Sequence, residues 1–210
     1  MEVANVITAF ASVATAVIAG LALYTWKREF IGKKKIELAA EIMLAACELQ
    51  DVYIHARIPA ISKDEIDEAH KWIKAEKESH PTNADVYPER LQYLVPHRRL
   101  EQQREVLDRF RSLQNQAYIY WGKEIMSAFL KLTSYNLIIL QASKDLYYGK
   151  DTPEYEHLHD IIFYKMKDGQ IVSGDKISTD INNVVEEFRR ILEPLYMDKR
   201  VVWKTDGAEK

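Results

Sequence analysis

The chain has 210 residues, a formal net charge of −3 and one cysteine, Cys47. Its length suits one domain with or without an appendage, and seven glycines and six prolines are too few for the many turns of an all-β fold. The single cysteine excludes an intrachain disulfide framework, and the near-neutral charge gives no reason to expect a nucleic acid partner.

The first predicted element is a membrane-spanning helix. No residue from Val3 to Trp26 carries a formal charge. At about 1.5 Å per residue this segment covers about 36 Å, which exceeds the roughly 30 Å hydrocarbon core of a bilayer. A cleaved signal peptide would begin with basic residues, but Met1 and Glu2 stand there instead. We therefore expect residues 1–28 to form a transmembrane anchor, the alternative being a buried core helix of a soluble protein.

Basic residues follow this segment and none precedes it. By the positive-inside rule the N-terminus should lie outside and the rest of the chain in the cytoplasm, as in a single-pass protein of the inner membrane. Aromatic rings and cations are typical of the headgroup level, either to bind anionic lipid or only to set the topology. The predicted membrane-interface residues are Tyr24, Trp26, Lys27, Arg28, Lys33, Lys34 and Lys35.

Small residues recur every four positions within the segment, at Thr8, Ser12, Ala16 and Gly20. Such a row lies along one face of a helix and allows two backbones to approach closely. It predicts helix–helix association and a homo-oligomer formed through the transmembrane helix. The alternative is an alanine-rich span with no role in pairing.

Helical periodicity resumes after the basic segment. Apolar residues over 36–57 keep the i, i+3/i+4 spacing of a helix, which ends before Pro59. Gly32 leaves open whether this helix continues the anchor. A shorter amphipathic helix is expected over 64–78.

The longest predicted helix extends over 88–149, with Pro96 and Gly122 as its interruptions and Gly149 as its C-terminal cap. Residues 137–142 are apolar nearly all round, so the second half should be the most buried helix.

Three further elements are expected towards the C-terminus. A helix should cover 153–165, and Gly169 and Gly174 favour a short hairpin with a strand at 170–172. An amphipathic helix over 181–195 should end or kink at Pro194.

The predicted fold class is therefore all-α. We expect a transmembrane anchor at 1–28, an antiparallel cytoplasmic helical bundle of four or five helices at 29–196, and a loosely ordered tail at 197–210.

Four short stretches resemble a set of uncharacterised bacterial proteins. They are Tyr24–Phe30, Glu37–Ala39, Trp121–Ile125 and Leu192–Leu195. The resemblance implies bacterial origin, one N-terminal span and a helical cytoplasmic domain. No activity is established for that set, so it implies no catalytic residues.

Signatures of catalysis or cofactor binding are missing from the sequence. There is no glycine-rich phosphate loop, HExxH, GxSxG or CxxC motif. The best metal candidate is the segment 156–160, but His157 and His159 would diverge by about 200° on a helix, which favours surface polar residues. Cys47 lies on an alanine-rich apolar face typical of a core. We therefore expect no metal, no cofactor and no enzymatic activity.

A basic stretch extends from Arg90 to Arg111, but acidic residues interleave it. This pattern favours a solvated, ion-paired face over a nucleic-acid groove. Its cationic and imidazole residues are Arg90, His97, Arg98, Arg99, Arg104, Arg109 and Arg111. Trp121 and the neighbouring tyrosines Tyr118 and Tyr120 are interpreted as packing at a bundle end.

The leading functional hypothesis is a non-enzymatic interaction, scaffold or sensing module at the inner face of a bacterial membrane. Its partners would be the lipid bilayer and a cytoplasmic protein whose identity the sequence does not give. One alternative is an oligomerising membrane effector of the toxin or phage-defence type, and another is an enzyme whose site is not readable from sequence.

Overall fold

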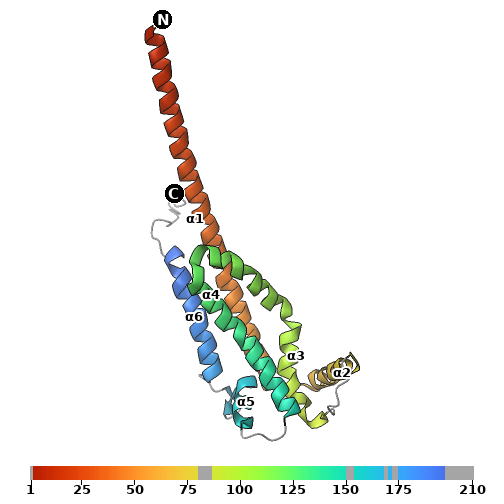
Figure 1. Cartoon of the computed structure of the whole chain (residues 1–210). Coiled ribbons are helices and arrows are strands. Elements are labelled where there is room, and N and C mark those ends of the chain that lie inside the picture. Colours follow the sequence, from red (N-terminus) through yellow and green to blue (C-terminus); the bar gives the residue numbers. More distant parts are fainter. Residues whose placement is uncertain (1, 80–86, 150–153, 168–169, 172–174, 197–210) are drawn as a thin grey trace, which may run out of the picture. The chain divides into compact units, whose positions relative to one another are not determined.

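The computed structural model of the chain is almost entirely helical, which confirms the all-α class (Figure 1). It describes residues 2–79, 87–149, 154–167, 170–171 and 175–196. The elements are α1 (Glu2–Ala56), α2 (Lys63–Ser79), the 3₁₀ helix η1 (Pro88–Leu94), α3 (Val95–Gln102), α4 (Arg104–Tyr148), α5 (Tyr155–Ile162), β1 (Met166–Lys167), β2 (Gln170–Ile171) and α6 (Lys176–Tyr196). Two compact units divide the chain, residues 1–40 and residues 41–210, and we call the second unit the body.

The first unit is helical throughout its described part. The helix continues through Gly32, which answers the question that this glycine leaves open in the sequence. All described side chains from Ser12 to Lys34 are exposed. An ion pair joins Lys33 to Glu37 one turn later, with 3.9 Å between nitrogen and oxygen.

Three phenylalanines from distant segments form the centre of the body. The ring of Phe110 lies 4.5 Å from that of Phe129 and 5.8 Å from that of Phe188, centroid to centroid. All three side chains are fully buried. The Tyr53 hydroxyl donates a hydrogen bond to the carbonyl of Leu132 at 3.0 Å, which ties α1 to the same core.

Helix α4 reverses its direction at Gly122, so that its two halves lie side by side (Figure 1). Gly122 has φ 66° and ψ −143°, a conformation that residues with a side chain rarely adopt. The contact between Phe110 and Phe129 closes the hairpin. The sequence predicts an interruption at Gly122, and the structure shows that this interruption is a turn.

Several predicted boundaries are confirmed. Helix α1 ends at Ala56, ahead of Pro59, and α2 covers the short helix expected over 64–78. Pro88 occupies the first turn of η1. Gly149 caps α4, and a Cβ at that position would lie 2.3 Å from the carbonyl oxygen of Asp145, so only glycine fits.

Other boundaries differ from the predictions. The 88–149 segment is also broken at Gln103, and Pro96 lies in the first turn of α3. Helix α5 ends at Ile162, short of 165, because Phe163 is extended and leads into the ribbon. The ribbon confirms the expected hairpin: β1 and β2 pair antiparallel, with Met166 opposite Ile171. Residues 150–153, 168–169, 172–174 and the predicted tail at 197–210 lie outside the described residues.

Candidate functional site

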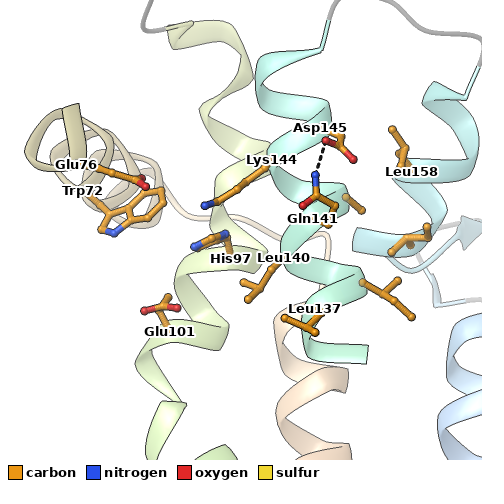
Figure 2. Close-up of a pocket in the computed structure, with 13 residues that line it drawn as sticks. Trp72, Glu76, His97, Glu101, Leu137, Leu140, Gln141, Lys144, Asp145 and Leu158 are labelled. Atoms are coloured by element: carbon orange, nitrogen blue, oxygen red, sulfur yellow. Dashed lines mark hydrogen bonds between the residues drawn. The ribbon is translucent and has the colours of Figure 1, made fainter. Parts of the chain in front are cut away.

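A cavity of about 870 Å³ opens in the body between α2, α3, α4 and α5 (Figure 2). Cavities of roughly 300 to 1,000 Å³ are typical of small-molecule sites. We call it the Trp72 cavity. It is lined by Trp72, Glu76, His97, Glu101, Leu137, Ile138, Leu140, Gln141, Ala142, Lys144, Asp145, Leu158 and Ile161.

One wall of the cavity is apolar. Leu137 and Ile138 contribute from α4, and Leu158 and Ile161 from α5. Leu137 is 61% exposed and Ile138 is 37% exposed. The predicted all-round burial of 137–142 is therefore wrong for these two residues, because this side of α4 faces the cavity and not another helix.

Two aromatic rings pack together at the cavity, one from α2 and one from α3. The rings of Trp72 and His97 lie 4.7 Å apart between centroids and are tilted by 40°. The guanidinium carbon of Arg98 lies 5.5 Å from the Trp72 ring, within the range of a cation–π contact. These contacts fix the orientation of the indole.

His97 is buried, with only 4% of its surface exposed. Burial, followed by the charges of Lys144 and Arg98, lowers the pKa of His97 to about 4, against the effect of a hydrogen bond to the backbone of Leu140. The imidazole is therefore neutral at pH 7. Its Nδ1 atom is buried and has no hydrogen-bond partner among the described residues, so it can donate or accept according to the tautomer. Such a low pKa makes His97 a poor general base and suits binding better.

Acidic groups outnumber basic ones in the lining. The lining contains three carboxylates, those of Glu76, Glu101 and Asp145, and one ammonium, that of Lys144. The Oε2 atom of Glu76 is buried and has no partner among the described residues, whereas Asp145 accepts a hydrogen bond of 2.8 Å from the Gln141 amide. Figure 2 shows Glu76, His97 and Lys144 beside Trp72. The lining thus carries a net negative charge, and buried polar atoms of Glu76 and His97, together with Nε of the neighbouring Arg98, have no partner among the described residues.

A second polar cluster surrounds Arg57, whose side chain is fully buried. Its guanidinium donates hydrogen bonds of 2.8 Å to the Ile161 carbonyl and 2.9 Å to the Asp160 carbonyl. It also donates to the Ser178 hydroxyl at 2.8 Å and forms an ion pair of 2.7 Å with Asp175. These bonds join the end of α1 to α5 and to the start of α6. Sequence reasoning missed Arg57; the one signal was a cation just after a helix C-terminus.

Arg99 joins two segments in a similar way. Its guanidinium donates to the carbonyls of Ile58 at 2.6 Å and Ala60 at 2.8 Å, and to Glu65 at 2.7 Å. The interpretation of the basic stretch as a solvated face is therefore wrong for Arg99 and His97, because both are buried in contacts between helices.

The remaining residues of that stretch fit the interpretation where their pairs are described. Arg109 pairs with Glu48 at 2.8 Å, and Arg104 and Arg111 both pair with Asp108. These ion pairs are partly or fully exposed.

All seven predicted membrane-interface residues lie on α1. Tyr24 and Trp26 are exposed. The Trp26 ring stacks on Phe30 at 5.5 Å, and the Lys34 ammonium lies 5.5 Å from the Phe30 ring. A shallow pocket of about 280 Å³ is lined by Tyr24, Lys27, Arg28 and Ile31.

The predicted association row also lies on α1. Ser12, Ala16 and Gly20 are exposed, whereas the side chain of Thr8 lies outside the described part. A Cβ at Gly20 would meet nothing within 4 Å, so a larger residue fits the single chain.

The other candidates bring no reactive cluster together. Among the described residues, no three His, Cys, Asp or Glu side chains lie close enough to hold a metal ion. The His159 ring contacts Phe163 at 5.1 Å, while His157 lines a smaller cavity of about 380 Å³. Burial raises the pKa of the Cys47 thiol, which disfavours the nucleophilic thiolate.

The chain gives no match in three comparisons, with protein-family models, with curated proteins and with solved structures.

Proposed function

We propose that the protein is a membrane-anchored, non-enzymatic sensing or scaffold module at the inner face of a bacterial membrane. Residues 1–28 are the anchor, and the helices of the body form an antiparallel bundle in the cytoplasm. The Trp72 cavity is the recognition site of this bundle.

The exposure of the anchor carries the proposal. Large apolar side chains on this part of α1 are between 55% and 67% exposed, namely Val13, Val17, Ile18, Leu21 and Leu23. Exposure of these side chains to water is unfavourable, because burying one methylene group lowers the free energy by about 0.8 kcal/mol. A hydrocarbon environment removes that cost without any protein partner.

Helix α4 also bears on the membrane assignment. Among the described residues it is the one helix long and apolar enough to cross a membrane by length and composition, with 39% of its most apolar stretch buried, which by itself is weak evidence. The described side chains begin at Ser12, so the uncharged segment 3–26 extends beyond them. We assign α4 to the body because it turns at Gly122 and contributes Phe110 and Phe129 to the core.

The test compares two double variants of the full chain in bacterial cells. Replacing Val13 and Val17 with arginine puts two charges into the anchor, at about 3 kcal/mol each near the centre of a span. Replacing Leu44 and Leu130 with arginine puts the same charges on exposed positions of the body. We expect the parent and the body variant to stay in the membrane pellet after alkaline carbonate washing, and the anchor variant to be released.

Topology is tested on the same cells. Protease added outside intact cells should spare the body and digest it after lysis. Release of the parent protein by carbonate, or digestion of the body in intact cells, would overturn the proposal.

The exposed small residues Ala16 and Gly20 favour one second candidate, an oligomerising membrane effector. Gly20→Leu separates the two. In an effector this variant should abolish crosslinked dimers together with any effect on cells, because a bulky side chain holds the backbones apart. In a docking module, the function of the body should survive the change.

A further inference from the structure

We propose that the Trp72 cavity binds a small organic cation that carries N–H donors on an apolar body, such as a primary amine attached to an aromatic ring. This inference rests on the proposed recognition role of the body and names the chemistry of its ligand.

The donor requirement follows from two polar atoms. The Oε2 atom of Glu76 is buried, has no partner among the described residues and, as a carboxylate oxygen, only accepts hydrogen bonds. His97 lines the cavity, and its Nδ1 atom is likewise buried and without a partner among those residues; it accepts in the tautomer that carries its proton on Nε2. A ligand with N–H groups can pair with either atom, whereas a ligand with acceptors alone leaves Glu76 unpaired.

The positive charge follows from the carboxylates. With His97 neutral, the lining carries three carboxylates and one ammonium, a net charge of −2. A protonated amine can donate to the Glu76 carboxylate and neutralise part of this charge, whereas an anion would meet three carboxylates, with Lys144 and the neighbouring Arg98 in its favour.

The apolar body of the ligand follows from the apolar wall of the cavity. Leu137 and Ile138 expose apolar surface to the cavity, and Trp72 offers a ring whose orientation is fixed by His97 and Arg98. An aromatic or alkyl group packed there buries this surface. A small hydrated cation would leave it exposed.

Three probes with the same phenyl body test the proposal. They are 2-phenylethylamine, a cation with N–H donors; trimethyl(2-phenylethyl)ammonium, a cation without them; and 3-phenylpropionate, an anion. The full chain is held in phosphatidylcholine nanodiscs, and binding is followed through the indole N–H resonance of Trp72. Trp72→Phe identifies that resonance by its loss.

We expect the amine to shift the Trp72 resonance saturably. The trimethyl compound should bind at least tenfold more weakly, and the anion should cause no shift. Glu76→Gln should weaken amine binding at least tenfold, and His97→Phe, which keeps the ring contact with Trp72, at least fivefold. Glu124→Gln is the matched control, because Glu124 is an exposed glutamate of α4 outside the cavity lining, and this variant should bind the amine within twofold of the parent.

Melting curves establish that each variant is folded, and Glu76→Gln carries the test if His97→Phe is not. Equal binding of the amine and its trimethyl analogue, unchanged binding in Glu76→Gln, or no binding of the amine would each overturn the inference. If any of these occurs while the protein stays in carbonate-washed membranes with a protected body, the ligand assignment fails and the proposed function stands. Release from the membrane together with selective amine binding would mean that the proposed function fails and the ligand assignment stands.

Discussion

Replacement of Arg57 by leucine should destabilise the body strongly. The change leaves the Asp175 carboxylate, only 7% exposed, without its cation, and leaves the carbonyls of Asp160 and Ile161 without their donor. Burial opposes the charge of Asp175, but hydrogen bonds from Arg57 and Ser178 outweigh it and hold the pKa of that carboxyl below its usual value. The native state therefore holds Asp175 ionised and depends on Arg57 to do so.

The expected loss is about 3 to 5 kcal/mol, the usual cost of removing one partner of a buried ion pair. For a chain of this size, that lowers the melting temperature by about 6 to 20 °C. Arg57→Lys should lie between the parent and Arg57→Leu, because an ammonium keeps the charge but cannot reproduce the fork that reaches Asp175 and the two carbonyls together. Arg57→Leu combined with Asp175→Asn should recover part of the loss, since no uncompensated charge remains buried.

The assay is urea unfolding of the nanodisc-held chain, followed by circular dichroism. Arg189→Leu is the control, because Arg189 pairs with Glu186 on the exposed face of α6 and such pairs are worth about 1 kcal/mol or less. If Arg57→Leu loses no more stability than Arg189→Leu, the cluster does not hold α1, α5 and α6 together and the reasoning fails.

Three further predictions concern stability. The pKa of His97 is about 4 in the folded protein against 6.5 for the free group, so its contribution to the free energy of unfolding is complete above pH 6.5 and disappears as the pH falls towards 4. The parent should lose up to about 3 kcal/mol of stability over that interval, and His97→Leu should show a smaller loss between pH 7.5 and 4.5 when unfolding is measured at both. The Arg99 hydrogen bond, opposed by burial, lowers the pKa of Glu65 to about 2, so the ionised carboxylate stabilises the fold above pH 4.5 and this stabilisation is lost as the pH falls towards 2. Glu65→Gln should reduce the loss of stability over that pH interval, and it should cost about 1 kcal/mol at pH 7, since the carboxyl is partly exposed. Gly122→Ala should cost about 1 to 3 kcal/mol of stability through backbone strain alone, because the added Cβ would meet no other atom within 4 Å. Gly32→Ala lies in regular helix and should be neutral or stabilising, so equal effects of the two variants in thermal melts would contradict the account of the turn.

The parts of the fold that local chemistry determines could be predicted from the sequence. Pro59 ends α1 because a proline cannot continue a helix, and Gly149 ends α4 because a side chain there would clash with Asp145. The short ribbon likewise follows from turn-forming residues at its centre.

Long-range contacts could not be predicted in the same way. Gly122 interrupts a helix in any reading of the sequence, but its turn is defined by the packing of Phe110 on Phe129 and of both on Phe188. Arg57 reaches partners more than a hundred positions away, so no local pattern distinguishes it from a surface arginine.

The cavity could not be predicted for the same reason, and it lies where two residues of the predicted buried helix are exposed. A stretch such as 137–142, apolar on every side, indicates a helix surrounded by protein, yet Leu137 and Ile138 are exposed. Water solvates the carboxylates of Glu76, Glu101 and Asp145 that border this space, but it does not solvate the apolar wall, whereas an amphiphilic cation would satisfy both surfaces at once. The apolar wall and the carboxylates together, and not the exposure of two apolar side chains alone, point to such a ligand.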